Sequence, residues 1–205
     1  MRLIFVLGVI GGLSGCAYGG RAVEDIAPAG ASRVPTPAAF DVCYANGCKA
    51  QMHVRLSAGE WAPVAKLFAK PPADAADERA RIVHALQMVE LTVGHKTGLD
   101  ADRPGSFAGV GATHQQDCVD EMTNVATMLQ IFEGQGFLKD HVPGRRMTSS
   151  FFGPRGPWPH TVATIVETGT GREYVIDSWM QPFGALPYVM PIEDWERGKA
   201  LAYAF

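Results

Sequence analysis

Hydrophobic and polar positions follow two different periods along this chain. Residues 50–56 alternate between apolar and polar, which predicts a strand with one buried face. Ser-Ala-Gly-Glu at 57–60 is a capping box, so a helix should begin there and restart or kink at Pro63. Apolar residues then recur every three or four positions over 74–93 and 117–132, which predicts two longer helices that glycines close.

The second half of the chain is expected to form mainly strands and loops. A short strand is predicted over 137–142, followed by a loop rich in Arg, Pro and Gly over 143–159. Two strands over 160–167 and 172–179 are separated by Thr-Gly-Thr-Gly, a connection typical of a hairpin. A last extended piece precedes a short helix that opens at Pro191. Helices first and antiparallel strands afterwards predict the α+β class.

The N-terminus has the layout of a signal peptide. Arg2 precedes an apolar run over 3–10, and Leu-Ser-Gly at 13–15 supplies small residues before Cys16. The run is too short for a permanent transmembrane helix, which needs about 20 residues. The Leu-Ser-Gly-Cys ending resembles the lipobox of bacterial lipoproteins, which implies cleavage before Cys16, lipid on that cysteine and a membrane anchor. By the same resemblance, Ala17 points to the outer membrane, facing the periplasm. An ordinary signal peptide is the alternative.

Three parts are expected along the chain. Residues 1–15 form the lipoprotein signal peptide, 16–38 form a lipidated flexible tether rich in Ala, Gly and Pro, and 39–205 form a single domain. The net charge of −3 gives no general attraction to nucleic acid, so no nucleic-acid partner is expected. The sequence has no nucleotide-binding loop or calcium-loop pattern, and no cofactor is expected.

The remaining cysteines divide into a close pair and a single residue. Cys43 and Cys48 flank an Asn-Gly turn, and in an oxidising envelope they are expected to form a disulfide. Two reduced thiols or part of a metal site are the alternatives. Cys118 is then the remaining thiol of an exported protein, which calls for an explanation.

Cys118 lies where the third predicted helix begins. The positive end of a helix and its N–H groups stabilise a thiolate, and the same N–H groups could hold an oxyanion. Asp117, Asp120 and Glu121 add negative charge nearby. They oppose thiolate formation unless they point away or are paired.

His160 and Asp177 lie on the two strands of the predicted hairpin. If 168–171 form the loop, Glu167 pairs with Arg172, and His160 and Asp177 share one sheet face. They are then diagonal neighbours about 7–8 Å apart at the backbone, a separation that side chains can bridge. A loop one residue shorter or longer would place them on opposite faces.

These residues together resemble a known family. Asp-Cys-Val-Asp at 117–120, His-Thr-Val at 160–162 and Asp177 are similar to the transglutaminase-like cysteine superfamily, most of all its bacterial cysteine proteinases. The resemblance covers roughly residues 114–180. It implies a papain/transglutaminase-like core, with the nucleophile helix packed on a small antiparallel sheet and extra N-terminal helices. The family's usual aromatic residues after this motif are replaced by Glu-Met at 121–122, which bears on substrate preference.

The resemblance also implies the roles of the site residues. Cys118 would be the nucleophile, His160 the base and Asp177 the orienting residue, with Gln116 a candidate for helping the oxyanion. The substrate would be an amide bond in protein or peptide-like envelope material. The acyl group would pass to water, as in a peptidase or amidase, or to an amine.

Two other readings compete with the thiol enzyme. A zinc site could use His114 together with Cys118, His160 and Asp177. A non-catalytic envelope lipoprotein could keep the fold as a binding or scaffolding module, because fold does not imply activity. Buried aromatic cover over Cys118 would favour the scaffold, and an open cleft would favour the enzyme.

The other basic residues give weaker signals. Four histidines share no spacing and are expected on the surface or in the core, and three arginines of the expected loop could line a substrate-facing surface. They are His53, His84, His95 and His141, and Arg145, Arg146 and Arg155.

Overall fold

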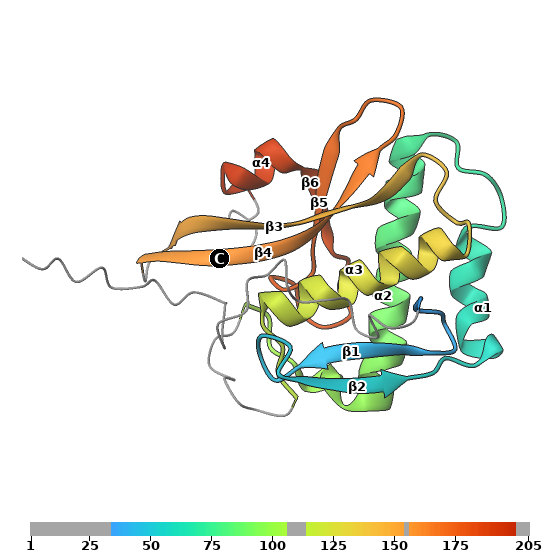
Figure 1. The fold of residues 1–205 in the computed structure, drawn as a ribbon, viewed down its shortest axis with the longest axis horizontal. Helices are drawn as coiled ribbons and strands as arrows, with labels where there is room; N and C mark the ends of the chain where they lie inside the picture. The colour runs from blue at the N-terminus through green and yellow to red at the C-terminus, as the bar shows by residue number, and fades with distance from the viewer. Residues whose placement is uncertain (1–33, 106–113, 154–155, 200–205) are drawn as a thin grey trace, which may run out of the picture.

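Two separate antiparallel sheets flank the helices in the computed structural model, which describes residues 34–105, 114–153 and 156–199 (Figure 1). The smaller sheet pairs β1 (Phe40–Tyr44) with β2 (Ala50–Val54). The larger sheet contains β3 (His141–Gly153), β4 (Gly156–Glu167), β5 (Glu173–Asp177) and β6 (Tyr188–Pro191), in sequence order.

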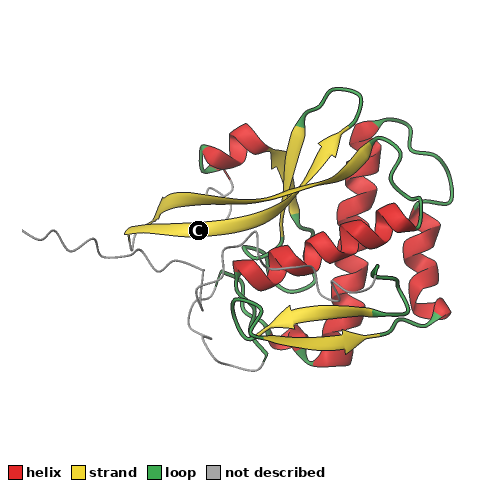
Figure 2. Cartoon of the chain, in the orientation of Figure 1, coloured by secondary structure: helices red, strands yellow, loops and turns green. Residues whose placement is uncertain are grey.

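The helices are α1 (Ala58–Leu67), α2 (Ala75–Thr97), α3 (Cys118–Gly134) and the short α4 (Ile192–Glu196), with a 3-10 turn, η2, at Leu99–Ala101. Helix α3 packs against both β1 and β4, and so lies between the two sheets (Figure 2). Separate helices and antiparallel sheets confirm the predicted α+β class.

Capping residues set the starts of the helices as predicted. The Ser57 side chain accepts from the Glu60 backbone N–H, and the Glu60 carboxylate accepts from the Ser57 N–H. Helix α1 then continues through Pro63. This proline lacks the N–H that would bond to the Gly59 carbonyl, and because Gly59 is exposed, water can bond to that carbonyl instead. Asp117 caps α3 by accepting from the backbone of Val119 and Asp120.

Helix α2 is longer than the sequence pattern indicated. It continues past Gly94 to Thr97 and ends at Gly98, whose φ of 79° is left-handed. Gly94 does not end the helix. Its missing side chain makes room for Phe183, because a Cβ there would lie 2.3 Å from the Phe183 ring.

The segment expected as a loop over 143–159 was predicted wrongly. Residues 141–153 form β3, which pairs along nearly its whole length with β4. The strand expected over 137–142 therefore begins only at His141. Pro143 and Gly144 are residues typical of loops, and the strand tolerates them because they lie at a β-bulge. Gly144 is required there, since a Cβ would lie 2.3 Å from the Thr164 hydroxyl oxygen.

The core forms where the predicted apolar faces of α2 and α3 meet the sheets. The stripe of α2 is buried throughout, and so is that of α3. These residues are Ile82, Leu86, Val89 and Val93 on α2, and Val119, Met122, Val125, Leu129 and Phe132 on α3.

The expected signal peptide over 1–15, Cys16 and most of the tether lie outside the described residues. At the end of the tether, the Pro37 carbonyl accepts a hydrogen bond from the Leu56 N–H, 2.9 Å away. No helix in the described part of the chain is long and apolar enough to cross a membrane.

Candidate thiol site

The register of the β4–β5 hairpin is the one that the sequence predicted. The Glu167 N–H donates to the Arg172 carbonyl over 2.9 Å, and Ala163 pairs with Ile176. His160 and Asp177 therefore share a sheet face, and Nε2 of His160 lies 2.7 Å from Oδ2 of Asp177. The two residues are 1% and 2% exposed. A buried contact this short holds the imidazole in one orientation.

Two tryptophans lie over the histidine. The ring centre of His160 is 5.0 Å from that of Trp179 and 5.8 Å from that of Trp195. Trp179 comes from the segment after β5, facing His160 as the predicted register required. Trp195 comes from α4, and no sequence signal indicated it. Together they give His160 an aromatic cover.

Cys118 is the first residue of α3 and is fully buried. Glu121 follows it by three positions, so the two side chains leave the same side of the helix. The Glu121 carboxyl accepts a hydrogen bond from the hydroxyl of Ser178, the residue after Asp177. Because α3 also packs on β4, its first turn lies against the end of β5. A hydrogen bond thus joins the first turn of α3, which carries Cys118, to the residue after Asp177.

The three acidic side chains near Cys118 in the sequence all accept hydrogen bonds. Asp117 caps the helix, and Asp120 accepts from the backbone N–H groups of Asn46 and Cys48, at 2.8 and 2.6 Å. Burial, followed by the charge of Asp117, raises the pKa of Asp120 to about 8. Burial, followed by the charge of Glu90, raises the pKa of Glu121 well above its usual range. At neutral pH the Asp120 carboxyl is therefore mainly protonated, and the raised pKa of Glu121 favours its neutral form, so both oppose a thiolate less than full charges would.

The predicted disulfide between Cys43 and Cys48 is confirmed, and its loop lies on the first turns of α3. The Cys43 carbonyl accepts from the side-chain amides of Gln116 and Asn124, each over 3.0 Å. With the two bonds to Asp120, these contacts fasten the loop to the helix that carries Cys118. Gln116 thus lies beside the start of α3, and its role toward an oxyanion stays a prediction.

The other candidates from the sequence have separate surroundings in the structure. His114 is exposed, and no group of three or more His, Cys, Asp or Glu side chains is arranged for a metal ion within residues 34–105, 114–153 and 156–199. His141 is buried against Glu78, with Nδ1 2.9 Å from the carboxylate. Arg145 is exposed on β3 and pairs with Glu173.

The remaining arginines and histidines complete this placement. Arg146 is partly buried on β3, and burial lowers its pKa. His53, His84 and His95 are exposed, and Arg155 lies outside the described residues.

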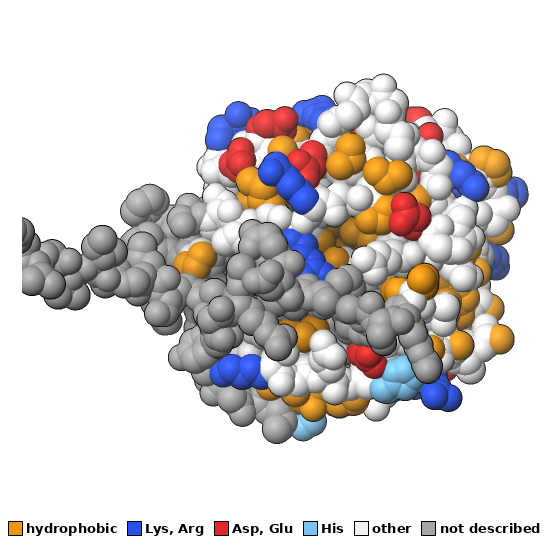
Figure 3. Space-filling model, viewed as in Figure 1, with side chains coloured by type: hydrophobic (Ala, Val, Ile, Leu, Met, Phe, Trp, Pro, Cys, Tyr) orange, Lys and Arg blue, Asp and Glu red, His pale blue; other side chains and the backbone are white. Residues whose placement is uncertain are grey.

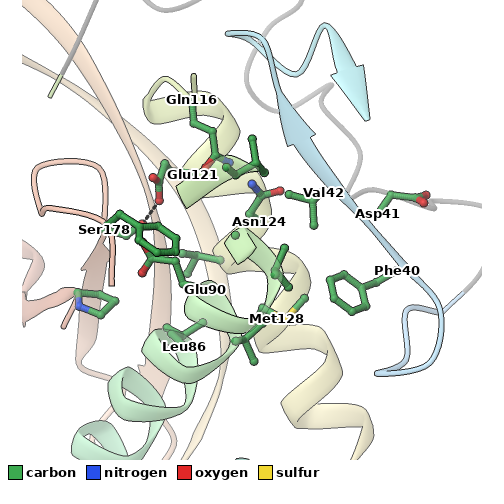
Figure 4. A pocket seen from close by; sticks show the side chains of 17 residues that line it. Phe40, Asp41, Val42, Leu86, Glu90, Gln116, Glu121, Asn124, Met128 and Ser178 are labelled. Atoms are coloured by element: carbon green, nitrogen blue, oxygen red, sulfur yellow. Dashed lines mark hydrogen bonds between the residues drawn. The ribbon is translucent and has the colours of Figure 1, made fainter. Parts of the chain in front are cut away.

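A pocket of about 600 Å³, including the solvent at its open side, lies beside the start of α3 (Figure 4). Gln116, Glu121 and Ser178 form one part of its wall, and Glu90 of α2 another. Sequence reasoning missed Glu90. Glu90 lies four residues after Leu86, and this helical spacing alone would have placed it on the buried side of α2. The molecular face in Figure 3 has a hollow with hydrophobic side chains in it, bordered by charged side chains of both signs.

Fold and site together define the class: an α+β protein with a buried His–Asp pair in its larger sheet and a buried thiol at the start of α3. No family model, curated protein or solved structure matches this chain.

Proposed function

We propose that this chain is an envelope thiol enzyme that cleaves or transfers amide bonds, built on a papain/transglutaminase-like core and anchored through lipid on Cys16. One observation carries the proposal. His160 and Asp177 form a buried contact of 2.7 Å in the register required for a Cys-His-Asp triad. The thiol that would complete the triad begins the helix whose first turn contacts the residue after Asp177.

The proposed reaction assigns one task to each residue. Asp177 holds the imidazole through Nε2, so the proton of the Cys118 thiol would pass to Nδ1. The thiolate would attack the amide carbonyl, and the first N–H groups of α3 would stabilise the oxyanion. As the C–N bond breaks, His160 would return the proton to the leaving amine. Water or an amine would then release the acyl group from sulfur.

The proposed location follows from two features. The lipobox-like sequence before Cys16 implies export and lipidation. The Cys43–Cys48 disulfide is typical of proteins in oxidising compartments, such as the periplasm. Protein or peptide-like envelope material on the periplasmic side of the outer membrane is therefore the proposed substrate.

The second candidate is a non-catalytic binding or scaffolding lipoprotein with the same fold. Burial favours it, because Cys118 is 0% exposed and His160 lies beneath Trp179 and Trp195. Because Cys118 is fully buried, a substrate can reach its thiol only when the side chains around it move. A scaffold would need no such movement.

The test is the rate at which iodoacetamide alkylates Cys118 in the full chain, measured by mass spectrometry. The enzyme proposal expects rapid reaction at about pH 6, well below the ordinary thiol pKa of about 8.5, and loss of that reactivity in His160→Ala. His84→Ala, which removes an exposed histidine, is the matched control and should react as the parent does. A thiol that is inert, or that reacts alike in all three proteins, supports the scaffold.

A further inference from the structure

The pocket beside α3 combines apolar walls with carboxyl groups. Val89 and Val93 of α2 and Met128 of α3 form part of the apolar wall, while Glu90 and Glu121 contribute acidic groups from two different helices (Figure 4). Such a lining suits a ligand with a hydrocarbon body and one polar end.

The carboxyl groups at this pocket accept hydrogen bonds from neutral donors. Glu90 accepts from the Gly184 N–H over 3.1 Å, Glu121 accepts from the Ser178 hydroxyl, and the nearby Asp102 accepts from the Gln116 N–H over 2.9 Å.

The acids also repel one another. Burial, opposed by the Gly184 N–H, raises the pKa of Glu90 to about 7, with a further contribution from the charge of Asp102. Burial likewise raises the pKa of Asp102 to about 6. A cation placed among these groups would offset both the cost of burying charged carboxylates and their mutual repulsion, since an opposite charge favours the ionised form.

A metal ion does not suit this arrangement, because no three acidic, His or Cys side chains of the described residues lie close enough to hold one. An organic cation can bridge more widely spaced carboxyls while its carbon atoms fill the apolar space. We propose that the pocket binds an alkylammonium group of the substrate, with the ammonium between Glu90 and Glu121 and its hydrocarbon stem against Val89 and Met128.

The bound ammonium would serve recognition and not acyl transfer. An amine held by carboxylates keeps its proton, so it has no lone pair with which to attack an acyl-enzyme. The pocket would therefore select a cationic side chain next to the bond that Cys118 attacks. This assignment to a substrate rests on the proposed function, whereas binding of the ammonium does not require catalysis.

The experiment measures binding of n-pentylamine to the full chain carrying Cys118→Ser, by titration calorimetry. Pentan-1-ol and pentanoate serve as neutral and anionic ligands of the same length. The proposal expects pentylamine to bind at least about tenfold more tightly than pentan-1-ol at about pH 8, and pentanoate to bind least. Affinity for pentylamine should fall toward about pH 5 as Glu90 and Glu121 at the pocket, and the nearby Asp102, take up protons.

Variants locate the site. Glu90→Gln keeps an acceptor for Gly184 and should weaken pentylamine binding by about tenfold or more. Glu133→Gln, an exposed change on α3, should leave binding unchanged. Equal binding of pentylamine and pentan-1-ol, no binding of either, or no effect of Glu90→Gln overturns the ammonium site. These outcomes leave the thiol chemistry untouched, because the test protein has no Cys118 thiol.

Discussion

We predict that the titration of Glu90 lowers the free energy of unfolding as the pH rises. Burial raises the pKa of Glu90 from 4.5 to about 7 in the folded protein. Between these two values the folded chain holds a proton that the unfolded chain releases. Unfolding therefore releases a proton, and the free energy of unfolding decreases with increasing pH across this window.

The size of the effect follows from the pKa difference. For a group that titrates near 7 when folded and 4.5 when unfolded, the free energy of unfolding falls by about 2–3 kcal/mol between pH 5 and pH 8. Glu90→Gln removes this loss, and its amide oxygen can still accept from Gly184. It also removes a charge that raises the pKa of Glu121. The variant should therefore be more stable than the parent at pH 8 and similar to it at pH 5.

Urea unfolding of the full chain at the two pH values, followed by tryptophan fluorescence, measures this difference. Glu133→Gln is the matched control, because it changes an exposed glutamate on α3 and should keep the parent's pH dependence. The reasoning is refuted if Glu90→Gln loses as much stability as the parent between pH 5 and pH 8, or loses more.

Two further predictions concern packing and buried hydrogen bonds. Glu78→Ala leaves the His141 ring and the backbone N–H of Lys139 without their carboxylate, so urea unfolding should show a loss of about 3–5 kcal/mol. Gly144→Ala forces a Cβ against Thr164 and should cost about 1–3 kcal/mol in the same assay. Gly134→Ala, at a position with nothing within 4 Å, is its control and should cost nothing. Equal stability of Gly144→Ala and Gly134→Ala would contradict this packing.

Local sequence signals predicted those parts of the fold that depend on local interactions. The capping groups at Ser57, Asp74 and Asp117 each bond to a backbone N–H within three residues, so the starts of α1, α2 and α3 were visible in the sequence. The register of β4 and β5 was predictable as well, because a four-residue loop between two clear strands determines which residues pair.

Long-range contacts defined the parts that sequence reasoning missed. Strand β3 contains Pro143 and Gly144, and its hydrogen bonds run to β4, so its own composition indicated a loop. Strand β1 is short and was missed for a similar reason, since only pairing with β2 and packing on α3 make it a strand.

The same distinction holds within the site. Hairpin rules connected His160 with Asp177, and the family resemblance added Cys118 to them. Trp195 approaches His160 from α4, and Glu90 and Glu121 line one pocket from two different helices, so both arrangements required the tertiary structure.

The most direct test of the central claim is the detection of an acyl-enzyme on Cys118. The full chain is incubated with p-nitrophenyl acetate, quenched in acid and analysed by peptide mass spectrometry. If Cys118, His160 and Asp177 act together, the acetyl group should be found on Cys118, and His160→Ala should abolish it. Acetylation that persists in His160→Ala, or a Cys118 that stays unmodified in the parent, would contradict the account.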